Sequence, residues 1–474
     1  MSRHRRAGGA RWVVLANLTI TATAGLLVLL LPFVLSPEEY GAWQLYLTLA
    51  LWLSYATFGL PEGAFVRLAG RDVRDWPVAA LGTQVVLLGA VFLAVLAVAA
   101  VPALLGRAGS EDDVLYRMLL AALVSALVFV PRTMVVTLLQ AQRRFAAFAA
   151  TVLVERIGLV LLTGLALAIG WTSPVLLAGL DVVAKVAGLV LAVVLARSLL
   201  RGIPAPAGEV RADVRASASI GLPLVLVNLA GIALHTVPRL AVERGWGVGT
   251  FGHVALAFSA SMTMLVLFNA LSLASYPDLA TAPDDTVRAR YLATRRRLAP
   301  YLGLSLLTAF PLMILVERLL PEYADAALYL GWLYPALLFE AKARTMTTNY
   351  AKRIGAQREL LAATLVALAV GAVWVLVGLL RHDLLVVMLA LVGGVAVRGV
   401  LADAVLARRL QVPWLGWAAY ELALTVAFLV SVAGGLTLRG AVGFAAAGIL
   451  LTLVPRLMGT ADRTAQPRRP SPWE

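Results

Sequence analysis

The chain has 474 residues, of which 61% are hydrophobic and 14% charged, and its formal net charge is +14. So apolar a composition excludes a soluble globular protein of this size and indicates a polytopic membrane protein. The absence of cysteine excludes a disulfide framework, thiolate catalysis and cysteine metal sites, and the four histidines show no metal-ligand spacing. We therefore expect no cofactor and no metal. We also expect no nucleic-acid partner, because no soluble stretch is long enough to form a binding domain.

Fourteen apolar stretches follow one another along the chain, and each approaches the length of about 20 residues that crosses a bilayer. The first begins after the basic sequence MSRHRRAGGAR and has no small-residue cleavage pattern, so we interpret it as an uncleaved span rather than a signal peptide. The predicted spans are Trp12–Leu35, Ala42–Leu60, Val78–Leu105, Met118–Leu139, Ala147–Ile169, Val175–Leu200, Ala218–Val242, Phe251–Ala274, Ala299–Val316, Ala326–Tyr350, Leu360–Leu380, Leu384–Leu406, Trp417–Leu438 and Ala441–Leu457.

The basic residues predict the orientation of these spans. With the N-terminus in the cytoplasm, the cytoplasmic segments carry 29 of the 40 lysines and arginines, the outer loops carry six, and five remain inside spans. An excess of Lys and Arg in short loops marks the cytoplasmic side of a membrane. We therefore expect a multi-pass protein of the bacterial inner membrane with both termini in the cytoplasm.

Two short similarities indicate an internal repeat. Tyr40-Gly41 and Phe251-Gly252 each open a span, and Ala-Gln-Arg occurs at both 141–143 and 356–358. The nearly equal separations fit two six-span halves that run in the same direction, although chance in an Ala/Leu/Arg-rich chain remains an alternative. We therefore expect an all-α fold with two six-helix bundles around a central cavity. The expected parts are a first bundle (1–200), a second bundle (201–410), two further transmembrane helices (411–457) and a cytoplasmic tail (458–474).

Charged residues inside spans are the strongest functional signal, because burying a charge in a bilayer is costly. Arg132 lies fourteen residues into its span, or roughly 21 Å at the rise of an α-helix. Glu340 and Arg398 lie at a similar depth in their own spans. Arg239 is expected near the outer end of its span, where its side chain can reach the interface, and His235 is expected to be a satisfied core histidine.

These charges predict a hydrated basic chamber for an anionic headgroup, because the planar guanidinium group can hold phosphate oxygens in pairs. The alternatives differ by residue: structural ion pairs for Asp181–Lys185 and for Glu155–Arg156, and the cytoplasmic interface for Arg398, whereas Arg132 is the hardest to explain without a function. Asp181 and Lys185 are four residues apart on one helix face and can neutralise each other. The candidate substrate-binding residues are Arg132, Arg156, Lys185 and Arg398, and the candidate ion-coupling residues are Glu155 and Asp181.

Several short motifs, spread over roughly residues 10–410, resemble a known family. The motifs are Tyr40-Gly41, Phe58-Gly59-Leu60-Pro61 with Arg67, Gly221-Leu222-Pro223, Gly249-Thr250-Phe251-Gly252, Tyr276-Pro277 and Leu320-Pro321-Glu322-Tyr323-Ala324-Asp325-Ala326. By these motifs the chain is similar to the polysaccharide-transport branch of the multidrug/oligosaccharidyl-lipid/polysaccharide exporter superfamily. One departure is Pro238-Arg239, where many relatives carry Asp-Arg, so Arg239 lacks the usual acidic neighbour.

The resemblance implies a flippase that moves a lipid-linked oligosaccharide, or a related envelope polysaccharide precursor such as that of lipopolysaccharide, by alternating access. Its implied partners are membrane lipid, the lipid-linked glycan and proteins of envelope glycan synthesis. A drug or small-solute antiporter of the same fold is one alternative. A membrane-embedded enzyme is another, for which Glu111-Asp112-Asp113 is the only cluster of carboxylates at an outer mouth. No internal loop is long enough for a separate catalytic domain, so we expect no enzyme.

Overall fold

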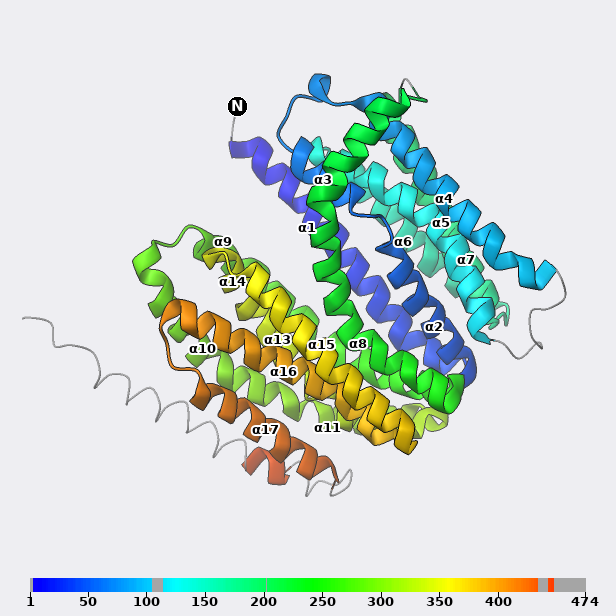
Figure 1. Ribbon diagram of the computed structural model, residues 1–474. Helices are drawn as coiled ribbons and strands as arrows, with labels where there is room; N and C mark the ends of the chain where they lie inside the picture. Colours follow the sequence, from blue (N-terminus) through cyan, green and yellow to red (C-terminus); the bar gives the residue numbers. More distant parts are fainter. Residues whose placement is uncertain (1–2, 105–113, 202, 434–441, 447–474) are drawn as a thin grey trace, which may run out of the picture. The chain divides into compact units, whose positions relative to one another are not determined.

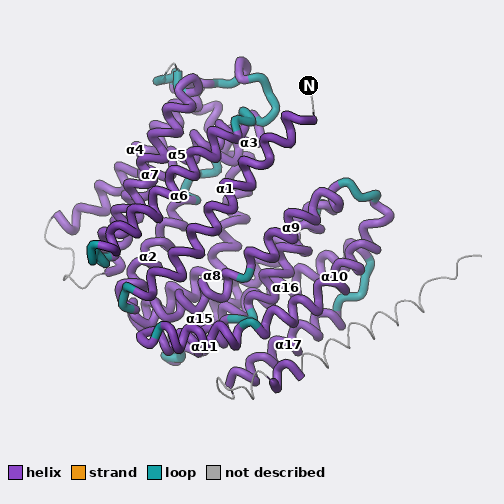
Figure 2. The backbone as a smooth tube through the Cα atoms, turned by 180° about the vertical axis from the view of Figure 1, so that it is seen from behind, coloured by secondary structure: helices purple, strands orange, loops and turns teal. Residues whose placement is uncertain are grey.

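The computed structural model describes residues 3–104, 114–201, 203–433 and 442–446, and throughout this part of the chain the secondary structure is helical, with no strand (Figures 1 and 2). The expected all-α polytopic fold is confirmed. Most of the last expected span, the tail from residue 458 and the acidic run at 111–113 lie outside the described residues.

Ten stretches of helix within the described residues are long and apolar enough to cross a membrane. One of them, Ala207–Asn269, has 63 residues and covers the expected span Ala218–Val242 and most of Phe251–Ala274. It contains α8 (Ala207–Thr263), which is broken at Gly247, where φ is 85° and ψ is 172°. Only glycine adopts this conformation readily. The number of fourteen spans stays a prediction.

The chain divides into two compact units, and α8 contributes residues to both. Unit 1 comprises Met1–Ile232 with Gly247–Gly252, and unit 2 comprises Ala233–Trp246 with His253–Glu474. The expected division into parts at residues 200, 410 and 457 stays a prediction.

In unit 1, α5 is the central helix and contacts five others: α2, α3, α4, α6 and α7 (Figure 1). Helix α1 packs on α6. Besides the first part of α8, the α-helices of unit 1 are α1 (Arg3–Leu30), α2 (Pro37–Ser54), α3 (Leu60–Leu68), α4 (Val78–Leu104), α5 (Val114–Ala141), α6 (Phe145–Ala168) and α7 (Pro174–Ala196).

The second expected span is shorter than the apolar run indicates. Helix α2 begins at a capping box, in which Ser36 and Glu39 bond each other's backbone N–H groups. It ends at Ser54, and Phe58 and Gly59 then adopt positive φ values of 54° and 74°. The chain continues as the separate helix α3, which passes so close to α8 that a Cβ at Gly63 would collide with the Ser217 backbone. The Phe-Gly-Leu-Pro sequence therefore marks a break between two helices rather than the end of one.

In unit 2, α16 is the central helix and contacts α12, α13, α14, α15 and α17. The described α-helices, besides the rest of α8, are α9 (Leu265–Ala280), α10 (Asp284–Leu307), α11 (Ala309–Leu319), α12 (Ala324–Leu333), α13 (Ala336–Lys342), α14 (Thr348–Ile354), α15 (Gln357–Arg381), α16 (Leu384–Leu410) and α17 (Leu415–Ala433).

The tenth expected span, Ala326–Tyr350, is a series of short pieces. Between α13 and α14 lies a π-helical segment, Ala343–Thr347, and the series ends at Gly355 with φ 71°. π-Helical turns interrupt the regular α-helical pairing and occur often at functional sites. This interruption places Glu340, Lys342 and Thr345 in the interior of unit 2, where each side chain is buried.

Candidate functional site

Arg132 of α5 lies in the interior of unit 1 and pairs with Glu155 of α6. One guanidinium nitrogen is 2.6 Å from the Glu155 carboxylate, and the two side chains are only 6% and 2% exposed. The same nitrogen donates to the Thr151 carbonyl oxygen at 3.4 Å, whereas the buried Arg132 Nε has no hydrogen-bond partner within the described part of the protein. Arg156 lies 3.8 Å from the other Glu155 oxygen and is 29% exposed.

Asp181 and Lys185 pair on one face of α7, as their spacing predicts. Lys185 Nζ is 2.5 Å from Asp181 Oδ2 and donates to Ser125 Oγ of α5 at 2.7 Å. The Tyr46 hydroxyl of α2 donates to the same Asp181 oxygen. This group therefore connects three helices with every charge partnered.

These two groups form one cluster through the ring of Phe129. Its centroid is 5.8 Å from the Arg132 guanidinium carbon and 5.5 Å from Lys185 Nζ, so both cations interact with one aromatic ring. Gly188, one turn beyond Lys185, makes room for the arginine, because a Cβ there would lie 2.9 Å from Arg132 Nε. We call Arg132, Glu155, Arg156, Asp181 and Lys185 the basic cluster, since its three cations outnumber its two carboxylates.

In unit 2 a second group of charges surrounds Glu340, whose side chain is 6% exposed. Arg398 of α16 donates to one of its oxygens, and His235 Nε2 of α8 lies 3.0 Å from the same oxygen. Arg344 lies 3.9 Å from the other oxygen. One carboxylate therefore faces two arginines and a histidine, which we call the Glu340 cluster.

A third group, the neutral cluster, consists of Arg295, Lys342, Asp403 and Glu421. Arg295 is 2.5 Å from Asp403 and 3.3 Å from Glu421, and Lys342 is 2.9 Å from Asp403 and also bonds Glu421. None of the four side chains is more than 5% exposed. Two cations balance two carboxylates, and the residues come from α10, α13, α16 and α17. This group ties four helices together.

Sequence reasoning missed the neutral cluster. Arg295 and Lys342 are two of the 29 basic residues counted as cytoplasmic, and neither was a candidate site residue, yet both side chains are buried beside carboxylates. Asp403 and Glu421 are the signal that could have found them, because each is a carboxylate within an expected span and needs a cation nearby.

Arg239 also differs from expectation. It is buried over the Phe258 ring, 4.9 Å from its centroid, rather than reaching the interface.

The structure brings five of the six candidate residues together and holds the sixth, Arg398, in the other unit. His235 contacts Glu340, as expected for a core histidine with a partner. The roles assigned to these residues in substrate binding and ion coupling stay predictions.

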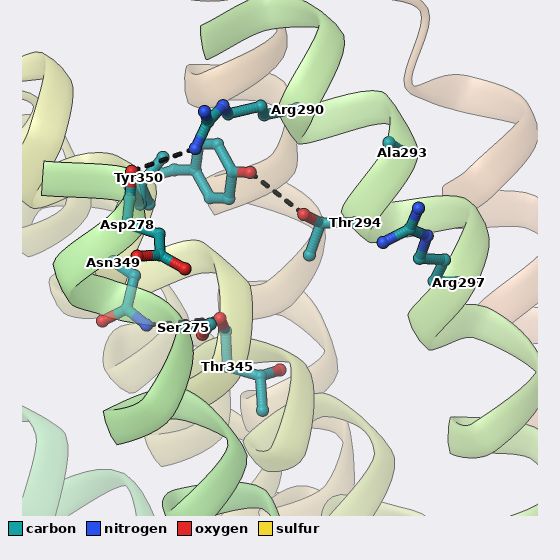
Figure 3. A pocket seen from close by; sticks show the side chains of 10 residues that line it. Ser275, Asp278, Arg290, Ala293, Thr294, Arg297, Thr345, Asn349 and Tyr350 are labelled. Atoms are coloured by element: carbon teal, nitrogen blue, oxygen red, sulfur yellow. Dashed lines mark hydrogen bonds between the residues drawn. The ribbon is translucent and has the colours of Figure 1, made fainter. Parts of the chain in front are cut away.

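Unit 2 also contains a polar cavity of about 380 Å³ between α9, α10, the π-helical segment and α14 (Figure 3). Two arginines, an aspartate and several hydroxyl and amide groups line it. These residues are Ser275, Asp278, Leu279, Arg290, Ala293, Thr294, Arg297, Thr345, Asn349 and Tyr350.

Of the comparisons with known proteins, the comparison with solved structures identifies the fold. No protein-family model matches the chain, and no curated protein matches it in sequence. The chain is similar to the inward-facing structure of a multidrug resistance MATE family transporter of the MOP superfamily. The TM-score is 0.59 at 14% identity, over 83% of this chain and 95% of the transporter. The outward-facing structure of a multidrug resistance MATE family transporter gives a TM-score of 0.50 at 15% identity, over 84% of this chain and 95% of the transporter.

The lipid II flippase MurJ, in an inward closed conformation, gives a TM-score of 0.44 at 12% identity, over 96% of this chain and 99% of the flippase. A score this low supports no structural argument. At the identity of the MATE transporters, similarity shows the fold alone. The chain is therefore a helical membrane protein with the fold of MATE transporters.

Proposed function

We propose that this protein moves a lipid-linked oligosaccharide, or a related precursor of an envelope polysaccharide, from the inner to the outer leaflet of the bacterial cytoplasmic membrane by alternating access. The observation that carries the proposal is the surplus of cations around buried carboxylates in each unit. The basic cluster holds three cations against two carboxylates, and Glu340 faces two arginines and a histidine.

A surplus cation inside a span is expensive, and an anionic ligand in a hydrated path offsets that cost. A lipid diphosphate supplies such an anion, and guanidinium groups can bind its oxygens in pairs. Arg132 and Arg156 both lie beside the Glu155 carboxylate, so a phosphate group that displaced this carboxylate would contact two guanidinium groups. We assign substrate contact to Arg132, Arg156, Lys185 and Arg398, and ion coupling to Glu155 and Asp181.

A drug or small-solute antiporter is the second candidate, because the fold is that of multidrug transporters. The two candidates differ in the charge of what they carry. Cationic drugs require surplus carboxylates, whereas the basic cluster and the Glu340 cluster both have surplus cations. The charge balance therefore favours the anionic lipid.

Reconstituted vesicles distinguish these candidates. The purified chain is placed in liposomes with a fluorescent undecaprenyl-diphosphate-linked disaccharide, and dithionite quenching measures its appearance in the other leaflet with an imposed proton gradient. Ethidium transport is measured in parallel. We expect quenching to show flipping of the diphosphate lipid and no ethidium transport. Ethidium movement without lipid flipping would contradict the proposal.

A further inference from the structure

The polar cavity of unit 2 is separate from the charge clusters, and neither its two arginines nor its hydroxyl groups have a role in the proposed transport path. Arg290, Thr294 and Arg297 recur at the spacing of one helical face of α10 and form one wall (Figure 3). Tyr350 stands on α14 against this wall, with its hydroxyl 3.1 Å from Thr294 Oγ1. The cavity volume of about 380 Å³ is within the range of small-ligand sites.

The arginines have unused donors. Arg290 donates through one nitrogen to the Asp278 carbonyl oxygen at 3.0 Å, and within the described residues it has no carboxylate partner. Arg297 has neither a hydrogen bond nor an ion pair within the same part of the chain, and it is exposed. Two guanidinium groups on one face, free of carboxylate partners, suit a phosphate ester.

The opposite wall suits hydroxyl groups. The Asn349 side-chain nitrogen donates to Ser272 Oγ at 2.9 Å and to the Thr345 carbonyl oxygen, which leaves the amide oxygen as an acceptor. Asp278, Ser275 and Tyr350 add further polar groups to the lining. Asp278 would repel a bare phosphate but can accept hydrogen bonds from the hydroxyl groups of a larger headgroup.

The cavity lies where a lipid headgroup can reach it. The helical stretch Asp284–Leu319 has 36 residues. At the rise of an α-helix this is about 54 Å, whereas the hydrocarbon core is about 30 Å thick. Both arginines precede the apolar run Ala299–Val316, the ninth expected span, so we expect the part of α10 that carries them to extend beyond the hydrocarbon. The π-helical segment contributes Thr345 to the same cavity, and such segments are frequent at functional sites.

We propose that this cavity binds a phosphorylated headgroup that also carries hydroxyl groups, with Arg290 and Arg297 on the phosphate. Two sources supply this chemistry: the sugar diphosphate of a lipid-linked glycan, or the glycerol phosphate of a bulk membrane lipid. The proposal does not depend on transport, since it concerns binding at the membrane surface.

The test measures binding to the full chain in phosphatidylcholine nanodiscs that are doped with phosphatidylglycerol or with an undecaprenyl-diphosphate-linked disaccharide. Native mass spectrometry gives the apparent Kd of each added lipid. We expect Arg297→Ala to weaken binding about tenfold and R290A/R297A more, because a hydrogen bond to a charged group contributes on this scale. Arg288→Ala is the matched control, since Arg288 is an exposed arginine of α10 outside the cavity lining.

The outcomes separate the sources and the alternatives. Tighter binding of the glycan lipid identifies the substrate as the source, and equal or tighter binding of phosphatidylglycerol identifies bulk lipid. Asn349→Ala should lower affinity for phosphatidylglycerol more than for phosphatidic acid, which has no headgroup hydroxyl, because the Asn349 amide oxygen is an acceptor in the opposite wall. The proposal is overturned if R290A/R297A binds both added lipids like wild type, or if R288A loses as much affinity as R297A. A chain that binds the headgroup but does not flip the diphosphate lipid would refute the transport proposal and leave this site intact.

Discussion

The basic cluster of unit 1 and the neutral cluster of unit 2 bury similar numbers of charges but differ in balance. In the neutral cluster, Arg295 and Lys342 each contact both Asp403 and Glu421, and all four side chains are almost fully buried. In the basic cluster, three cations face two carboxylates, and Arg156 is partly exposed. Within the described residues both Arg132 Nε and Arg295 Nε lack a hydrogen-bond partner, so the two clusters differ in charge balance and exposure.

If the basic cluster has the role proposed for it, this difference means that a buried charge inside a membrane protein is not by itself a functional residue. A closed, balanced group has no capacity left for a ligand and serves to join helices, at a cost when one partner is removed. A group with a surplus cation retains that capacity. Charge balance is therefore a better criterion than depth in the membrane.

The largest expected effect is in the neutral cluster. Asp403→Ala leaves Arg295 and Lys342 buried with a single carboxylate, so we expect a loss of about 3–5 kcal/mol in the free energy of unfolding. Thermal unfolding in detergent measures the loss. Arg409→Ala is the control, because Arg409 pairs with Glu359 at the surface and should contribute at most about 1 kcal/mol. Equal effects of the two substitutions would show that the neutral cluster does not hold the helices together.

Arg132→Lys tests the basic cluster while a cation still faces Glu155. Lysine keeps the charge and loses the guanidinium fork, so we expect normal abundance with flipping of the diphosphate lipid reduced about tenfold, the equivalent of roughly one charge-assisted hydrogen bond. Arg132→Ala should abolish flipping. It also leaves Glu155 buried without its closest cation, so its abundance must be measured alongside. Full flipping activity in Arg132→Ala would remove Arg132 from the substrate path.

A smaller effect is expected at Asp181. Asp181→Asn keeps an oxygen that can accept from Tyr46 but removes the charge that faces Lys185. If Asp181 takes up a proton during transport, the variant should remain folded, and its gradient-driven flipping should weaken and lose its dependence on pH. Flipping rates between pH 6 and 8 in vesicles measure this. An unchanged pH profile would assign Asp181 and Lys185 to structure alone.

Much of the fold was predictable from the sequence because long apolar runs specify membrane-spanning helices directly. The breaks were not. The break between the end of α2 and the beginning of α3 depends on positive φ at Phe58 and Gly59. The π-helical segment that contains Thr345 leaves no pattern in hydropathy. The Asp181–Lys185 pair followed from its spacing.

Long-range partners were harder to predict. Glu155 for Arg132 and Arg398 for Glu340 lie on other helices, and hydropathy does not show which helix faces are adjacent. The burial of Arg295 and Lys342 was missed for a related reason, since the sequence does not show whether a basic side chain faces solvent or carboxylates on other helices.

The most direct test of the central claim changes the charge balance of the basic cluster at its most exposed member. Arg156 is 29% exposed, so Arg156→Gln and Arg156→Glu should leave the protein folded while reducing the surplus from one cation to none and then to one anion. Flipping of the fluorescent undecaprenyl-diphosphate disaccharide is measured for both variants and the wild type. We predict a stepwise loss, with Arg156→Glu inactive toward this lipid at unchanged thermal stability. Wild-type flipping in Arg156→Glu would contradict the claim that the surplus cation serves an anionic substrate.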